Sequence, residues 1–167
     1  MVKLLLAGTG LIGHRHMQHI LEHPDLELIG IIDPLITEEK IKGVKTYNSL
    51  SDINTVADGI ILATPTDTHA DLTIQSLKMG MHVLVEKPVA ASLQEADKMI
   101  NASEKTGLSI LVGHHRRHHP LVNETINILN SGKIGRPVAA SLMWLMRKQD
   151  GYFDVDWRKG IDGGPVK

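Results

Sequence analysis

The chain has 167 residues, 42% of them hydrophobic and 22% charged, with a formal net charge of −1 and no cysteine. This length allows one domain and part of a second, and the composition is typical of a globular protein. The charge balance argues against nucleic acid as a partner, and the apolar runs are too short to span a membrane. The lack of cysteine excludes disulfides and thiolate chemistry. We therefore expect a cytoplasmic protein.

An apolar run over residues 2–7 leads into a glycine-rich turn, and an amphipathic stretch over residues 11–21 follows it. The turn has the pattern G-x-G-x-x-G, formed by Gly8, Gly10 and Gly13. A strand, this turn and a helix in that order are typical of a dinucleotide site, where the glycines allow a tight turn, close approach of a pyrophosphate and close helix packing. The first helical turn, with Leu11 and Ile12, would direct its N–H groups at the phosphates. The alternative is a glycine-rich turn without a ligand.

The second apolar run, residues 26–32, is typical of a parallel strand buried on both faces, and Asp33 ends it. Asp33 lies 20 residues after Gly13, the spacing expected of a carboxylate that accepts hydrogen bonds from the adenine ribose. A carboxylate there also repels a 2′-phosphate, and no Arg or Lys follows before Lys40, so NAD is favoured over NADP. The alternative is an aspartate that begins a turn before Pro34.

Strands and helices then alternate, which predicts an α/β fold with a mostly parallel, doubly wound sheet of the Rossmann type. Strands are expected over residues 44–47, 59–63, 81–85 and 109–112. Helices are expected over residues 67–79, from the Ser92 capping box to just before Gly107, and over 120–130, with a helical turn from Ser49.

The aromatic residues change in density near residues 135–137 and mark a domain boundary. Only Tyr47 precedes residue 140, and four aromatic residues follow it: Trp144, Tyr152, Phe153 and Trp157. We expect residues 1–136 to form the dinucleotide-binding domain and residues 137–167 to be the incomplete beginning of an α+β second domain. Residues 138–146 are predicted to form a long strand whose apolar edge seeks a partner.

Polar segments follow three predicted strands, at the edge where open α/β sheets bind ligands. The first segment contains Thr64, Pro65, Thr66 and, beyond them, His69, although a well-capped turn explains most of these residues. The second is Glu86-Lys87-Pro88, in which Lys87 would face the nicotinamide end of a cofactor and act as a general acid or base. A surface ion pair at the end of the strand is the alternative.

The third polar segment, residues 113–120, carries four histidines in the sequence Gly-His-His-Arg-Arg-His-His-Pro. Consecutive residues of an extended segment point to opposite faces, so these histidines cannot all share one ion. No acidic or cysteine partner has the spacing of a metal ligand, and we predict no metal site. Polar residues that line a cofactor or substrate crevice are the favoured interpretation.

In this order the motifs resemble the N-terminal half of the glucose–fructose oxidoreductase/inositol dehydrogenase (Gfo/Idh/MocA) family, over essentially all 167 residues. The matching segments are Gly8 to Gly13 with His16, Ala63-Thr64-Pro65 with His69, Glu86-Lys87-Pro88, Gly113 to Arg117 with Pro120, and Trp157-Arg158 followed by Gly163-Gly164-Pro165. His118 departs from the aromatic residue, usually Phe, that is common at this place.

The resemblance implies reversible hydride transfer between NAD(P) and a hydroxyl group of a sugar, polyol or cyclitol. It makes Lys87 the catalytic lysine, which polarises the substrate oxygen and handles its proton. It places cofactor-binding residues at Thr64, Pro65, Thr66, His69 and Glu86, and substrate-side residues at His115, Arg117, Trp157 and Arg158. The family often has a cis peptide bond in this turn, so we expect one between Lys87 and Pro88.

The same resemblance implies a longer protein, a homo-oligomer in its full-length form. The family continues past its Gly-Gly-Pro landmark into an Asp/Asn…His segment that completes the catalytic site, and the 167 residues do not include that segment. Two interpretations therefore stay open: an oxidoreductase seen as a truncated chain, and a non-catalytic dinucleotide-binding or regulatory module.

Overall fold

The computed structural model describes residues 1–143, 145, 147, 150, 151 and 154, and its strands form one seven-stranded sheet in the order β3-β4-β2-β1-β5-β6-β7. The strands are β1 (Val2–Ala7), β2 (Leu26–Ile32), β3 (Lys40–Ile41), β4 (Val44–Tyr47), β5 (Gly59–Leu62), β6 (His82–Val85) and β7 (Ile110–Val112). The α-helices are α1 (Leu11–Glu22), α2 (His69–Lys78), α3 (Leu93–Thr106) and α4 (Pro120–Asn130). Short 3-10 turns cover Leu50–Asp52, Thr66–Thr68 and His115–His118.

The carboxyl ends of five strands lie in one row along an edge of the sheet. Ala7 pairs with Ile32 on one side and with Leu62 on the other, and Val85 pairs with Leu62 and Val112, all in parallel register. The polar segments that follow these strands therefore meet at the same edge. This alignment confirms the predicted doubly wound sheet and fixes where a ligand site can form.

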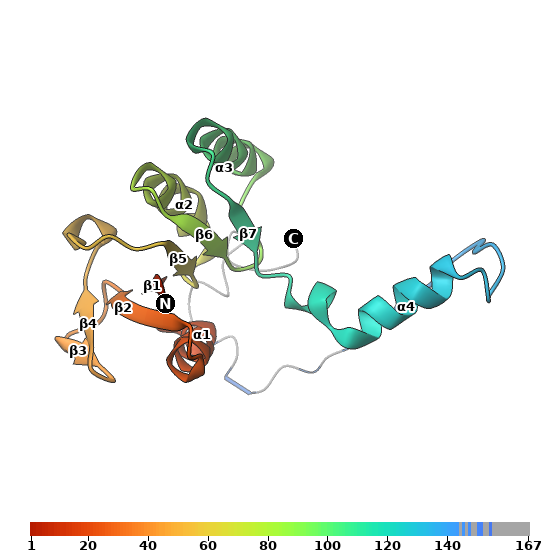
Figure 1. The fold of residues 1–167 in the computed structure, drawn as a ribbon, viewed down its shortest axis with the longest axis horizontal. Coiled ribbons are helices and arrows are strands. Elements are labelled where there is room, and N and C mark those ends of the chain that lie inside the picture. The colour runs from red at the N-terminus through yellow and green to blue at the C-terminus, as the bar shows by residue number, and fades with distance from the viewer. Residues whose placement is uncertain (144, 146, 148–149, 152–153, 155–167) are drawn as a thin grey trace.

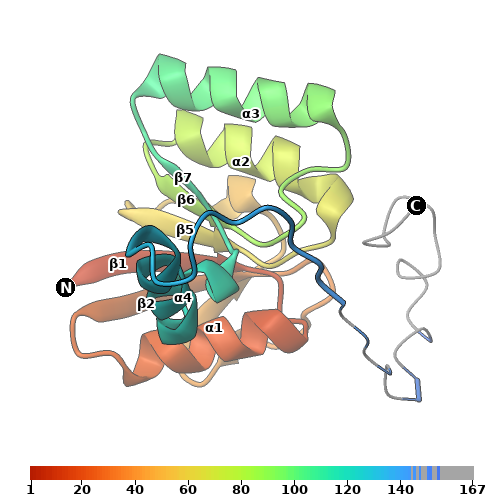
Figure 2. The same cartoon turned by 90° about the vertical axis from the view of Figure 1, so that its right-hand side faces the viewer.

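The helices form a layer on each face of the sheet. Helix α1 packs on one face, and α2 and α3 lie side by side on the other (Figures 1 and 2). The larger core cluster lies under α2 and α3 and includes Leu62, Leu77 and Met99, and the smaller one lies under α1 and includes Met17 and Ile31. The central strand β5 is buried along its whole length because both faces are covered.

Local signals in the sequence explain where the helices begin and end. The Ser92 hydroxyl accepts a hydrogen bond from the Glu95 N–H at 3.2 Å and so caps α3, which ends at Gly107 in the left-handed conformation with φ of 70°. Ser49 caps the helical turn at Leu50–Asp52 in the same way. These predicted helix boundaries are confirmed to within a few residues.

The structure differs from the predicted elements in two places. The two-residue strand β3 was not predicted; it pairs antiparallel with β4 around a turn in which Lys42 and Gly43 both have positive φ. The predicted strand over residues 138–146 is wrong for the residues that the structure describes: 138–143 and 145 adopt no regular structure, and residues 144 and 146 lie outside the description. A strand needs hydrogen-bonded neighbours, and this segment pairs with no described strand.

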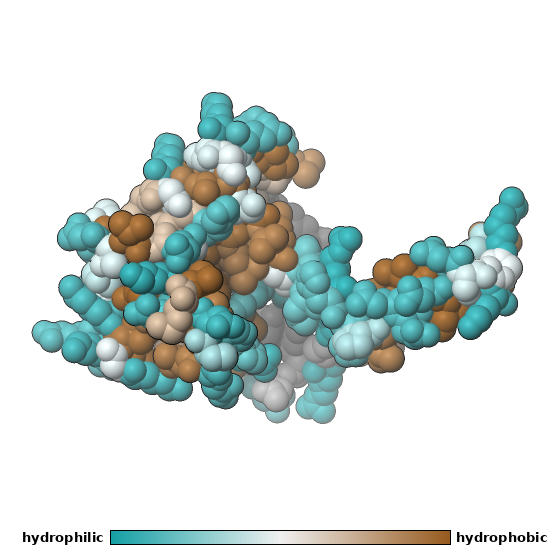
Figure 3. Space-filling model, viewed as in Figure 1, coloured by the Kyte–Doolittle hydropathy of each residue, from teal (hydrophilic) through white to brown (hydrophobic). Residues whose placement is uncertain are grey.

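Helix α4 extends away from the sheet and buries none of its residues (Figure 1). Apolar side chains gather along it (Figure 3), and those that are exposed include Leu121, Val122, Ile126, Ile128 and Leu129. Among the described residues, no helix combines the length and the apolar character needed to cross a bilayer.

Candidate functional site

The glycine turn between β1 and α1 is packed so closely that two of its glycines admit no side chain. A Cβ atom on Gly8 would lie 2.4 Å from the Ala63 carbonyl oxygen, and Gly8 also has a φ of 91°. A Cβ on Gly13 would lie 2.0 Å from the Gly8 carbonyl oxygen. Gly10 differs, because its Cβ would meet no atom within 4 Å and so faces open space. The turn is therefore closed on the protein side and open at Gly10, as a phosphate cradle requires.

The N-terminus of α1 is ready to bind an anion. In the described part of the chain, no side chain caps this helix at Gly10, and its first turn contains no acidic residue. Leu11 and Ile12 lie at the surface, with exposed fractions of 65% and 39%. The first N–H groups of the helix and the positive end of its dipole therefore stay available to a phosphate. Together with the open space at Gly10, these features fit the pyrophosphate of a dinucleotide.

Asp33 ends β2 beside this turn, and three donors hold its carboxylate. The Thr9 N–H and the Thr9 hydroxyl donate to Oδ2 at 2.9 and 2.6 Å, and the Leu35 N–H donates to Oδ1 at 3.0 Å. Partial burial alone would raise the pKa of Asp33, but the hydrogen bonds from the Thr9 hydroxyl and from the N–H groups of Leu35 and Thr9 outweigh it and lower the pKa. An ionised carboxylate thus lies next to the phosphate cradle.

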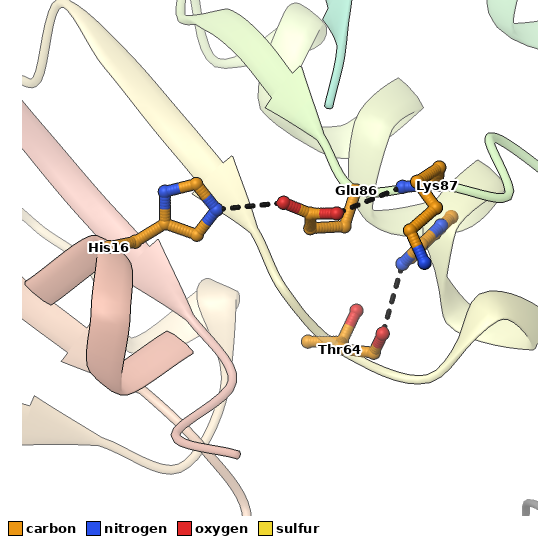
Figure 4. A network of polar contacts seen from close by, with 5 residues as sticks. His16, Thr64, Glu86 and Lys87 are labelled. Atoms are coloured by element: carbon orange, nitrogen blue, oxygen red, sulfur yellow. Dashed lines mark hydrogen bonds and ion pairs between the residues drawn. The ribbon is translucent and has the colours of Figure 1, made fainter. Parts of the chain in front are cut away.

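Glu86, at the end of β6, joins three segments of the chain. Its Oε1 lies 2.9 Å from His16 Nε2 on α1, and its Oε2 accepts a hydrogen bond from the Lys87 N–H at 3.2 Å (Figure 4). A Cβ on Gly113, just after β7, would lie 2.9 Å from the Glu86 carboxyl group, so a side chain there would displace the carboxyl group from its present position. The hydrogen bond from His16 is the largest influence on Glu86 and, with that from the Lys87 N–H, lowers its pKa against the effect of burial.

His69 ties two of the predicted site loops together beneath the surface. Only 1% of its surface is exposed, and its Nδ1 and Nε2 lie 2.9 Å from the Pro88 carbonyl oxygen and 3.0 Å from that of Thr64. The Lys87–Pro88 peptide bond is cis, as predicted. With both ring nitrogens next to backbone carbonyl oxygens, His69 links the loop that holds Thr64 to the loop that holds Pro88. Its assignment to the cofactor site stays a prediction.

The remaining residues of the predicted site differ in their surroundings. Lys87 is exposed, and its side chain extends toward the loop that holds Thr64 (Figure 4). Pro65 is exposed, whereas Thr66 is buried with 7% of its surface accessible. The Thr64 hydroxyl accepts a hydrogen bond from the Thr68 hydroxyl at 2.7 Å, which stabilises the turn from within.

Two of the predicted substrate-side residues lie in the described part of the chain, on the segment that follows β7. His115 and Arg117 are exposed on the 3-10 turn after β7, and within the described residues neither side chain has a polar contact with Glu86 or Lys87. Trp157, Arg158 and residues 163–165 lie outside the described residues. Across the described positions, no group of three or more His, Asp or Glu side chains could hold a metal ion.

The sequence interpretation missed three contributors to the site. It gave no role to Thr9 or to Gly113, and it included His16 in a motif without its partner. The contacts of these residues span 24 positions for Thr9 with Asp33 and 70 for His16 with Glu86, so no local pattern reveals them. The sequence does offer one signal for the two carboxylates, because Asp33 and Glu86 each directly follow a predicted apolar strand.

Comparison with known proteins agrees with this geometry. Residues 2–114 match the Gfo/Idh/MocA model, described as an oxidoreductase family with an NAD-binding Rossmann fold. The chain is 29% identical over 147 residues to scyllo-inositol 2-dehydrogenase (NAD⁺) of Bacillus subtilis, and 28% identical over 138 residues to the rhizopine catabolism protein MocA of Rhizobium meliloti. These alignments cover 82% and 80% of the chain, and 42% and 44% of the relatives.

Among solved structures, the WlbA dehydrogenase of Bordetella pertussis in complex with NADH and UDP-GlcNAcA is 30% identical, with a TM-score of 0.75. The match covers 81% of this chain and 41% of that one. The chain thus spans less than half the length of the curated relatives described above. The resemblance seen in the sequence is confirmed, and the matched residues end within the segment that follows β7.

Proposed function

Because the chain belongs to the Gfo/Idh/MocA family of oxidoreductases, with an NAD-binding Rossmann fold over residues 2–114, we propose that it binds NAD and serves hydride transfer. The proposed substrate is a hydroxyl group of a sugar, polyol or cyclitol, the class to which inositol belongs. The names of the relatives support this class, since scyllo-inositol 2-dehydrogenase and inositol 2-dehydrogenase are among them.

The position of Asp33 carries the proposal for the cofactor. Its ionised carboxylate lies against the glycine turn, bonded to the Thr9 N–H at 2.9 Å, while the uncapped end of α1 faces open space at Gly10. The N–H groups of Leu11, Ile12 and their neighbours would bind the pyrophosphate, and Asp33 would accept hydrogen bonds from the adenine ribose. A 2′-phosphate would be repelled there, so NAD is preferred over NADP.

Lys87 is the proposed catalytic residue. NAD supplies the acceptor for the hydride when it is bound. Oxidation of the hydroxyl group also releases a proton, which the Lys87 amine would accept and then return when the reaction runs in reverse. Glu86 would hold the backbone at Lys87 through the N–H contact, and His69 would fix the turn through the Pro88 carbonyl oxygen. His115, Arg117, Trp157 and Arg158 remain proposed substrate-side residues.

Titration calorimetry with NAD and NADP tests the cofactor assignment. We expect tighter binding of NAD, and we expect Asp33→Ala to weaken NAD more than NADP because only NAD gains from the carboxylate. Equal affinities in the unmodified chain, or tighter binding of NADP, would contradict the proposed role of Asp33.

A screen of sugars, polyols and cyclitols with NAD tests the reaction. We expect NAD binding with negligible turnover from the 167 residues, since they span only 42–44% of the relatives described above. NAD-dependent oxidation that Lys87→Ala abolishes would contradict that expectation and strengthen the oxidoreductase assignment. A non-catalytic dinucleotide-binding or regulatory module is the second interpretation, and the match of residues 2–114 to an oxidoreductase family favours the enzyme over it.

Partners and location complete the proposal. We expect the protein to bind a small-molecule substrate and to bind neither nucleic acid nor a membrane. We expect it to be located in the cytoplasm. The exposed apolar residues of α4, together with Val138, Leu142, Met143 and Leu145, support self-association. Light scattering of the whole chain and of a chain ending at Gly135 measures it, with a larger particle expected for the whole chain.

A further inference from the structure

Thr9 makes a pair of contacts that the glycine pattern itself does not require. Thr9 stands between Gly8 and Gly10 in the sequence. Its hydroxyl and its N–H both donate to the same oxygen of Asp33, at 2.6 and 2.9 Å. The other carboxylate oxygen accepts from the Leu35 N–H at 3.0 Å. Three donors, two on one oxygen and one on the other, together restrict the orientation of the carboxylate relative to the turn.

The backbone on both sides of this contact is held in place. The Gly8 N–H donates to the Ile32 carbonyl oxygen at 2.8 Å, so the turn is bonded to the residue that precedes Asp33. Thr9 is half-buried, and in the described part of the chain its hydroxyl is the one side-chain donor to Asp33. Removal of this hydroxyl would leave two backbone donors, one on each oxygen, and would free part of the carboxylate's rotation.

We propose that Thr9 is a positioning residue that sets the preference for NAD over NADP by orienting the Asp33 carboxylate. This inference rests on the proposed function. A ribose diol needs two acceptor oxygens at defined positions, so an oriented carboxylate binds it better than a rotating one. A 2′-phosphate gains nothing from that orientation, because its repulsion depends mainly on the charge.

The matched variants are Thr9→Val, which keeps the shape of the side chain without the hydroxyl, and Thr9→Ser, which keeps the hydroxyl. Calorimetry measures the Kd of each chain for NAD and for NADP. We expect Thr9→Val to raise the Kd for NAD about 5- to 10-fold, a change in the range of one ordinary hydrogen bond, and to change the Kd for NADP less than about 2-fold. Thr9→Ser should stay within about 2-fold of the original chain for both cofactors, because it retains the donor.

A second measurement separates positioning from general damage to the fold. An NMR titration of the Asp33 carboxyl carbon should show a higher pKa in Thr9→Val and an unchanged pKa in Thr9→Ser, because the hydroxyl lowers the pKa of Asp33. Thr9→Ala serves in place of Thr9→Val if the larger apolar side chain disturbs the turn. In an Asp33→Ala background, Thr9→Val should no longer change the ratio of the two affinities.

Each outcome decides the inference. A selective loss of NAD affinity that Thr9→Ser restores supports it. Equal losses for both cofactors, or an unchanged pKa of Asp33 in Thr9→Val, overturn it while leaving the proposed function intact. An unmodified chain that binds neither cofactor overturns the proposed function, and this inference with it.

Discussion

The segment up to β7 and the segment after it contain similar apolar residues but bury them very differently. Every apolar residue that is fully buried in the described chain lies between Leu5 and Met99. After residue 113, Leu121, Ile126 and Leu142 are 70%, 47% and 91% exposed. The apolar pattern therefore shows which face of an element can be buried, whereas burial itself depends on a second surface that meets that face.

The largest test of this contrast removes one leucine from each region. Leu62 on β5 is 0% exposed, so Leu62→Ala should lower the free energy of unfolding by about 2–5 kcal/mol through lost burial and the cavity left behind. Leu129 on α4 is 41% exposed, and Leu129→Ala should change it by less than about 0.5 kcal/mol. Urea unfolding followed by circular dichroism measures both. A large effect of Leu129→Ala that grows with protein concentration would show that α4 is covered by a second copy.

The glycine turn sharpens the contrast within the first region. Gly13→Ala places a Cβ against the Gly8 carbonyl oxygen and should cost about 1–3 kcal/mol of stability. Gly10→Ala enters open space and should leave the melting temperature almost unchanged while weakening NAD at least about 10-fold, since the methyl group occupies the path of the pyrophosphate. Thermal melting with calorimetry measures both. A stable Gly13→Ala chain would show that helix and turn are less tightly packed than described.

The smallest expected effect is on the pH dependence of the free energy of unfolding, compared for one contact between polar side chains in each region. The hydrogen bond from His16 lowers the pKa of Glu86. The stability that this bond gives the folded protein is therefore complete above the ordinary glutamate pKa, and it is lost as the pH falls through the lowered pKa of Glu86. His16→Ala should therefore cost about 1 kcal/mol at pH 6, and the difference should shrink in acid below pH of about 4. The pair Arg147–Asp150, 3.7 Å apart with side chains 89% and 98% exposed, is the control.

Urea unfolding at a series of pH values follows this difference. Arg147→Ala should leave stability unchanged at every pH, since exposed pairs contribute little. A loss of stability in His16→Ala that is the same at pH 3 and pH 6 would mean that packing, and not the charge of Glu86, explains it.

Most of the sheet could be predicted from the sequence, because five of its strands are short apolar runs between clear turn signals: β1, β2, β5, β6 and β7. Strand β3 could not, because its pairing depends on the turn at Lys42 and Gly43 and on only two residues. The strand expected over 138–146 has the right pattern, but a pattern cannot supply the neighbour that a strand needs. In the site, the glycines and Asp33 follow from spacing, whereas the burial of His69 could not be predicted because it depends on tertiary packing.

The contact between Gly13 and the Gly8 carbonyl has a thermodynamic consequence. Since a Cβ on Gly13 would lie 2.0 Å from the Gly8 carbonyl oxygen, the backbone of the helix packs directly against the backbone of the turn. The N–H groups at the start of α1 are thus held in position before any ligand arrives. Binding a dinucleotide would order few residues here, so little conformational entropy is lost and the affinity depends chiefly on direct contacts.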